Sequence, residues 1–101
     1  AVDRGGGAEK VGVEFAGQSV SSYGFERRFT GDPARLAADF VAANRDLKWM
    51  DTSQRGYFTL DITHDRIEAE YLFVPAKDGR GVKVTGRKTL AVEHGARQLL
   101  V

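Results

Sequence analysis

The sequence contains two histidines, His64 and His94, the side chains best suited to transfer protons or ligate metals near neutral pH. His64 lies close to Asp61 and Asp65, so a cation site at this position is one interpretation. The other is that His64 and Asp65 are solvated turn residues, because a zinc centre needs three or four converging ligands. His94, beside Gly95, is likewise interpreted as a solvated turn residue. We therefore expect no metal to be bound by this chain.

Three hydroxyl groups, at Ser19, Ser21 and Ser22, are the candidate nucleophiles. A serine nucleophile needs a histidine base and a third group that orients the base. The sequence places no histidine next to these serines, and the Gly-x-Ser-x-Gly spacing is missing. We expect the hydroxyls to cap or bond the backbone, and we predict no catalytic residue in this chain. A hydrolase that uses the serine cluster is the alternative.

Two further patterns have the residue types for phosphate binding or acid–base chemistry. Arg80, Lys83 and Arg87 surround a glycine-rich loop, but its glycines lack phosphate-loop spacing. These basic residues are interpreted as a solvated surface, with phosphate contact as the alternative.

Glu68 and Glu70 are two residues apart on an expected strand and therefore point to one face. An exposed sheet face is the favoured interpretation for this pair, and acid–base work is the other.

The composition favours one ordinary globular domain. The chain has 101 residues, of which 42% are hydrophobic, and it contains no cysteine. Its formal net charge of +1 comes from 15 basic and 14 acidic side chains mixed along the chain. Such a balance gives no strong field for nucleic acid or an anionic membrane, so neither is an expected partner. No apolar run approaches the roughly 20 residues that a membrane helix requires.

The chain opens with Ala1 and has three consecutive glycines over residues 5–7. This start predicts a linker or leader over residues 1–9, in a piece of a longer protein. The remaining residues, 10–101, are expected to form a single α+β domain.

One helix is predicted over residues 33–43. Asp32 can accept hydrogen bonds from the free amide groups at a helix start, and Pro33 fits the first helical position. Leu36, Phe40 and neighbouring apolar residues recur at helical spacing, so one face should pack on a sheet. Asn44 is expected to end the helix in a left-handed conformation.

Alternating apolar residues predict the strands that position the candidate chemistry. The expected strands cover residues 11–15, 47–50, 55–63, 66–74 and 89–93. The short polar connection between the third and fourth predicts an antiparallel hairpin, in which Phe58, Leu60 and Ile62 pack under the helix. The fold class is therefore α+β, a mostly antiparallel sheet of about five strands with one packed helix. The stretch from Lys77 to Gly86 is predicted to be a mobile loop.

Three segments, in one order and spacing, carry a resemblance to a known family. They are VGVEFAGQSVSS at 11–22, NRDLKWMD at 44–51 and RGYFTLDIT at 55–63. They resemble the C-terminal portion of PhoD-like alkaline phosphatases, which are metallophosphatases, and Arg55-Gly56-Tyr57 is the most specific piece. The sequence departs from the family at Arg45 and Asp46, where the family commonly has Pro-His.

The resemblance implies a bacterial parent enzyme that hydrolyses phosphate mono- or diesters with calcium and iron. It implies export to the periplasm or the extracellular space, usually by the twin-arginine route. The metal ligands would lie in the preceding N-terminal phosphatase domain of the parent, which would be the partner of this chain. The chain itself would be a non-catalytic C-terminal domain that completes the phosphatase core and contributes to the active-site rim.

By the same resemblance, Asn44, Arg55 and Tyr57 are the residues predicted to face the missing catalytic part. The alternative is that Tyr57 fills a core or interface pocket and Arg55 pairs with a carboxylate. A rival function is a free-standing ligand-binding or dimerisation module. We also expect the isolated chain to self-associate as a twofold homodimer through a sheet face or an edge strand, since unpaired edges are templates for a second copy.

Overall fold

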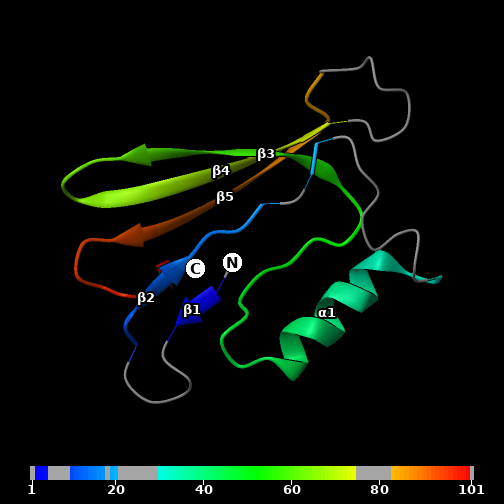
Figure 1. Ribbon diagram of the computed structural model, residues 1–101, viewed down its shortest axis with the longest axis horizontal. Helices are drawn as coiled ribbons and strands as arrows, with labels where there is room; N and C mark the ends of the chain where they lie inside the picture. The colour runs from blue at the N-terminus through cyan, green and yellow to red at the C-terminus, as the bar shows by residue number, and fades with distance from the viewer. Residues whose placement is uncertain (1, 5–9, 18, 21–29, 75–82, 101) are drawn as a thin grey trace.

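The structure is a computed structural model that describes residues 2–4, 10–17, 19–20, 30–74 and 83–100. In this part of the chain one helix accompanies two antiparallel sheets (Figure 1). The elements are β1 Val2–Arg4, β2 Gly12–Glu14, α1 Pro33–Ala43, β3 Arg55–Ile62, β4 Arg66–Val74, β5 Gly86–Glu93 and β6 Leu99–Leu100. The predicted α+β class is confirmed.

Helix α1 has the predicted bounds because its start is encoded locally. The carboxylate of Asp32 accepts a hydrogen bond from the backbone N–H of Ala34 at 3.0 Å, and Pro33 is the first helical residue. The predicted left-handed end was wrong, since Asn44 is extended with φ −124° and ψ 106°. Its side-chain Nδ2 and its backbone N–H both donate to the carbonyl of Phe40, so the last turn is satisfied without a left-handed residue.

The main sheet is an antiparallel meander with the strand order β3-β4-β5-β6. The predicted hairpin of β3 and β4 is confirmed, with a register from Arg55 opposite Val74 to Ile62 opposite Ile67. The backbone N–H of Thr63 donates to the carbonyl of Arg66 at 3.0 Å and closes the turn. This bond also fixes which residues of β3 direct their backbone groups toward β4.

The predicted sheet of about five strands requires correction. The strand expected over 11–15 is β2, but it pairs with β1 in a separate two-stranded sheet. The strand expected over 47–50 is reduced to a single bridge between Leu47 and Val2. The fourth strand of the main sheet is β6, at the apolar end of the chain. The partner of an isolated alternating segment is a non-local choice, which periodicity alone does not specify.

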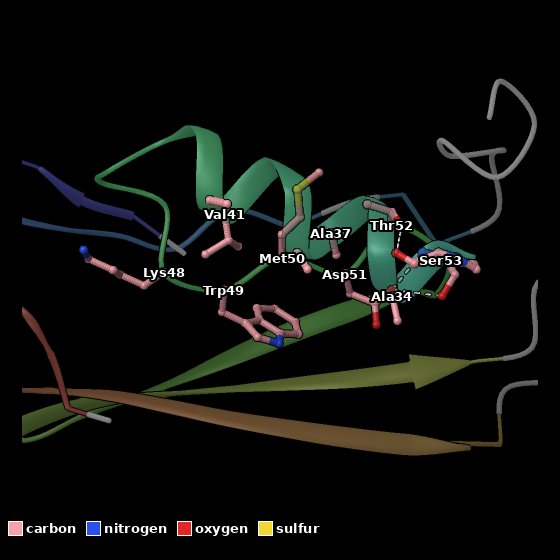
Figure 2. Close-up of a pocket in the computed structure, with 12 residues that line it drawn as sticks. Ala34, Ala37, Val41, Lys48, Trp49, Met50, Asp51, Thr52 and Ser53 are labelled. Carbon is pink, nitrogen blue, oxygen red and sulfur yellow. Dashed lines mark hydrogen bonds between the residues drawn. The ribbon is translucent and has the colours of Figure 1, made fainter. Parts of the chain in front are cut away.

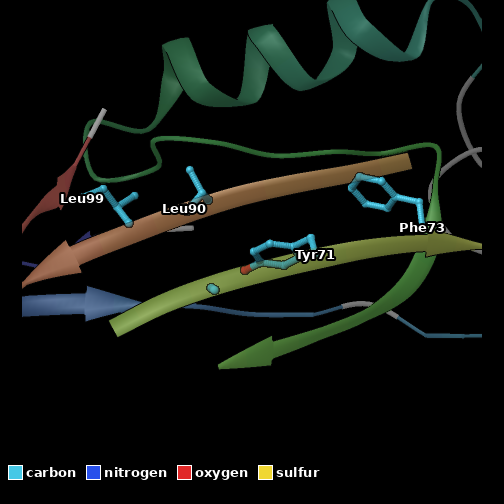
Figure 3. Packing of buried hydrophobic residues seen from close by; sticks show 5 residues of the cluster. Tyr71, Phe73, Leu90 and Leu99 are labelled. Carbon is cyan, nitrogen blue, oxygen red and sulfur yellow. The ribbon is translucent and has the colours of Figure 1, made fainter. Parts of the chain in front are cut away.

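The hydrophobic core lies on one face of β4, β5 and β6 (Figure 3). Its buried residues are Ala69, Tyr71, Phe73, Leu90 and Leu99, and Val13, Phe15, Trp49 and Phe58 pack against them. The covering layer therefore comes from β2 with the residues after it and from the segment before β3. Helix α1 lies outside this layer, above residues 48–53, and has no buried residue (Figure 2).

This layering corrects the expected position of the β3 side chains. Phe58 packs against the core, but Leu60 and Ile62, on the same face, are 47% and 66% exposed. The helix does not reach them because residues 48–53 separate it from the sheet (Figure 2). The second half of β3 thus keeps an uncovered apolar face.

Strand β1 lies within residues 1–9, the range predicted as a linker or leader, of which residues 1 and 5–9 are outside the described part. The loop predicted over 77–86 falls mostly on residues 75–82, which are also outside it. In the part that the structure describes, no helix is long and apolar enough to cross a membrane.

Candidate functional site

The candidate site is the segment 51–57, which joins the helix layer to β3 and contains the Arg55-Gly56-Tyr57 sequence. Asp51 organises its first half. The Oδ1 atom of Asp51 accepts from the backbone N–H of Ser53 at 2.8 Å and of Gln54 at 2.9 Å, and Oδ2 accepts from the Gln54 side-chain amide at 2.8 Å. A carboxylate that accepts this many hydrogen bonds holds a turn and directs the chain into β3.

The same contacts set the protonation of Asp51. Burial alone would raise the pKa of this carboxyl, but the hydrogen bonds from Gln54 and Ser53 outweigh burial and lower the pKa below its ordinary value of 3.8. Asp51 is therefore ionised and bonded to the turn at neutral pH. It has the properties of a structural carboxylate rather than of a general base, whose pKa would lie near the working pH.

We predict that Asp51→Asn lowers the free energy of unfolding by about 1–2 kcal/mol at neutral pH, because the amide cannot accept at both of its atoms. Since the folded pKa is lowered, the carboxylate stabilises the fold above about pH 4 and this stabilisation is lost as the pH falls through the folded pKa. Urea unfolding between pH 7 and pH 3 measures both effects. The control is Asp39→Asn, at an exposed position of α1. Equal acid sensitivity of the Asp51 variant and the native chain would contradict the assignment.

Arg55 and Tyr57 project from one face of β3, the face opposite to that of Phe58 and Tyr71. Arg55 is 3% exposed, whereas Tyr57 is 46% exposed. Of these two predicted site residues, Tyr57 is the one whose ring is open to a partner. A buried arginine is suited to holding neighbouring structure in place.

Asn44 lies elsewhere. The hydroxyl of Thr52 donates to the carbonyl of Pro33 at 3.1 Å, which places the segment 51–57 beside the N-terminal end of α1. Asn44 follows the C-terminal end of this 11-residue helix. At 1.5 Å per residue the helix spans about 16 Å, so the structure does not bring Asn44 together with Arg55 and Tyr57.

The sequence did not show why residue 56 is a glycine, but the structure does. A Cβ atom at this position would lie 1.9 Å from the backbone oxygen of Leu72 on β4. Any other residue would therefore force β3 and β4 apart. The backbone N–H of Gly56 points away from β4 and donates to the carbonyl of Ser19 at 3.4 Å. The glycine in Arg55-Gly56-Tyr57 thus permits close strand packing and anchors the segment after β2.

An open groove of about 520 Å³ separates α1 from residues 48–53 (Figure 2). Its lining is mainly apolar and includes Ala37, Val41 and Trp49, with Lys48 and Asp51 as the charged residues. The Lys48 ammonium donates to the carbonyl of Arg45 at 2.7 Å, and Asp51 holds its own turn. The groove is therefore shaped for apolar contact and offers no acid–base pair.

The paired glutamates are used in ion pairs across the exposed sheet face. Glu70 accepts from Arg87 at 2.6 Å, and Glu68 lies 3.3 Å from Arg66. This agrees with the interpretation of an exposed sheet face. Arg87 is thereby engaged by a carboxylate, which weakens the alternative that it contacts phosphate.

The remaining candidates do not form a ligand set in the described part of the chain. His64 and His94 are exposed on two adjacent turns, joined by the backbone N–H of His94 donating to the carbonyl of Asp65 at 2.8 Å, and Lys83 is exposed before β5. Within the described residues, no three histidine, aspartate or glutamate side chains gather where they could hold a metal ion. The predictions on Ser21, Ser22 and Arg80 fall outside the described residues.

A family model described as PhoD-like phosphatase matches residues 2–71, which are 70 of the 101 residues. The matched range includes β2, α1, the segment 51–57 and the β3–β4 hairpin as far as Tyr71. Neither the search of curated proteins nor the search of solved structures gave a match.

Proposed function

Because this chain belongs to the PhoD-like phosphatase family, we propose that it is the non-catalytic C-terminal domain of a metal-dependent phosphatase. In this role it completes the phosphatase core and contributes to the rim of the active site. The substrates of the parent enzyme are phosphate esters. The observation that carries the proposal is the segment 51–57, which contains Arg55-Gly56-Tyr57 and is held by the Asp51 hydrogen bonds and by close strand packing at Gly56. Its side chains are arranged for contact rather than for chemistry.

The contacts made by three acidic side chains support a non-catalytic role. Asp51 bonds its own turn, Glu70 pairs with Arg87, and Glu68 pairs with Arg66. A hydrolytic centre needs such carboxylates directed together at a metal or a water molecule. In this chain each of the three carboxylates instead holds a turn or forms an ion pair on the sheet.

The described residues do not fit the calcium and iron of the family, since no set of three potential ligands gathers among them. We propose that the preceding phosphatase part of the parent holds both metals. That part is then the partner of this chain. The family also leads us to propose a bacterial protein exported to the periplasm or beyond.

The rival function, a free-standing binding or dimerisation module, rests on the apolar groove and on the uncovered half of β3. A free-standing module would fold and function without a phosphatase part. The two functions therefore differ in whether a phosphatase part binds this chain.

Complementation in trans tests the proposal. The chain alone should not hydrolyse a chromogenic phosphate ester, with or without calcium and iron. The preceding phosphatase part, expressed separately with its metals, should gain activity at least about tenfold when this chain is added, because a completed core orders the site. Turnover by the purified chain, or no binding between the two parts, would overturn the proposal.

A pair of variants tests the predicted contact residue. Tyr57→Ala should weaken the complementation while leaving the chain folded, because the ring is 46% exposed. Thr59→Ala, the next position on the same face of β3, is the matched control and should complement as the native chain does. Equal loss in both variants would remove Tyr57 from the contact.

A further inference from the structure

The outer edge of β3 has backbone groups that are available to pair with another strand. In the described part of the chain β3 has a single neighbour, β4, and it is the outermost strand of the meander (Figure 1). The Thr63 amide bonds toward β4, so residues of odd number direct their backbone groups to β4 and those of even number direct them outward. The outward bond from Gly56 to Ser19 agrees with this alternation. Phe58, Leu60 and Ile62 therefore present backbone groups at the edge.

The side chains at this edge lack the features by which proteins block strand addition. Beyond Arg55 the strand has one charged residue, Asp61, and no lysine or proline. Leu60 and Ile62 lie on the core-facing side and are 47% and 66% exposed. An open backbone edge next to uncovered apolar side chains favours another strand over solvent.

We propose that this edge binds a second copy of the chain, with the two β3 strands antiparallel about a twofold axis at Leu60. In this register Leu60 lies opposite Leu60 of the second copy, and Phe58 lies opposite Ile62. The outward backbone groups of all three residues are paired. On the other face, Asp61 lies opposite Thr59, so no like charges meet.

Moving the twofold axis by one residue in either direction gives a less favourable pairing. An axis at Asp61 would place the two Asp61 carboxylates opposite each other, which is destabilising. An axis at Thr59 would place Ile62 opposite Gly56, whose backbone N–H already bonds to Ser19. Only the axis at Leu60 combines apolar pairs, unopposed charges and free backbone groups. The pairing uses the end of β3 away from Arg55, and it does not depend on the proposed phosphatase role.

Sedimentation velocity over a range of concentrations tests the association. The native chain should form dimers in a concentration-dependent way, and Ile62→Lys should raise the dissociation constant at least about tenfold, because it places a charge among apolar pairs. Val11→Lys is the matched control, since Val11 is 69% exposed and precedes β2, a strand of the other sheet; its dissociation constant should be unchanged. A native chain that stays monomeric to high micromolar concentration, or equal effects of the two substitutions, would overturn the proposal.

Single cysteines test the register, and the native chain contains none to interfere. Directly opposed residues of this kind have Cα atoms about 5.5 Å apart, so Leu60→Cys should form a disulfide-linked dimer on oxidation. The two Ile62 positions would lie four residues apart along the strands, about 14 Å, so Ile62→Cys should not cross-link. Circular dichroism verifies that both variants are folded. Cross-linking through residue 62 but not residue 60 would overturn the axis at Leu60.

Discussion

Gly56→Ala is expected to lower the free energy of unfolding by about 3 kcal/mol or more, a large share of what a domain of this size has. The added Cβ atom would lie 1.9 Å from the backbone oxygen of Leu72 and 3.1 Å from the Cα of Phe73. Both obstacles are backbone atoms of the central strand β4, so no side-chain rotation relieves the contact. The strands must separate at the start of the hairpin, where Arg55 and Tyr57 are held.

Urea unfolding followed by circular dichroism measures this effect. Gly12→Ala is the control, because Gly12 is also a strand glycine and a Cβ atom there would meet nothing within 4 Å. Its unfolding free energy should change by less than about 1 kcal/mol. If the two alanine variants were equally stable, close packing of β3 on β4 would not be the reason for a glycine at position 56.

The close packing of β3 on β4 at Gly56 also explains why a glycine stands in Arg55-Gly56-Tyr57, the most specific piece of the resemblance. Arg55-Gly56-Tyr57 places a buried cation, a close strand contact and an exposed aromatic ring on consecutive residues. The glycine is required by the strand pair, and the tyrosine is available to a partner. A sequence pattern of a family can thus combine a folding requirement with a contact surface.

Local features of this fold could be predicted from the sequence. The bounds of α1 follow from Asp32 and Pro33, whose effects act within one turn of the chain. The β3–β4 hairpin follows from two alternating segments joined by a short polar turn. Each depends on neighbours in the sequence.

The layering could not be predicted in the same way. Which segment covers the sheet depends on contacts between distant residues, such as Trp49 with Tyr71 and Phe73. The apolar pattern of a helix requires an apolar neighbour but does not specify whether a sheet or residues 48–53 provide it. The exposure of Leu60 and Ile62 follows from that choice and was not visible in the alternation of β3.

The candidate site was predicted in part. The resemblance directed attention to Arg55 and Tyr57, which the structure places on one face of one strand. It also selected Asn44, which is used to end α1 at a distance from them. Asp51, Thr52 and Ser53 are recognisable as turn residues in the sequence, and the structure confirms this turn, in which Asp51 accepts from the backbone N–H groups of Ser53 and Gln54.

Tyr71→Ala is expected to lower the free energy of unfolding by about 3–5 kcal/mol, the cost of truncating a large buried side chain. Tyr71 is 2% exposed, and its ring lies 5.0 Å from that of Trp49 and 5.1 Å from that of Phe58. Its hydroxyl donates to the carbonyl of Ala16 at 3.1 Å. One side chain thus joins β4 to the segment before β3, to β3 itself and to the residues after β2.

Two more substitutions separate the parts of this contribution. Tyr71→Phe keeps the ring and should cost about 1 kcal/mol, the worth of the bond to Ala16. Tyr57→Ala, at a tyrosine that is 46% exposed, should cost less than about 1 kcal/mol. Urea unfolding of all three variants gives the comparison, and equal losses from Tyr71→Ala and Tyr57→Ala would show that the central cluster does not hold the layers together.

The pH dependence provides an independent check on the same residue. Burial raises the pKa of Tyr71 above its ordinary value of 10.0, against the smaller lowering effect of the bond to Ala16. The folded state therefore favours the neutral phenol. The resulting stabilisation is complete below pH 10.0 and is lost as the pH rises toward the higher folded pKa. Tyr71→Phe has no phenol to ionise, so its unfolding free energy should fall less steeply above this pH than that of the native chain. Parallel decreases in the two proteins would show that Tyr71 is not the group whose ionisation opens the core.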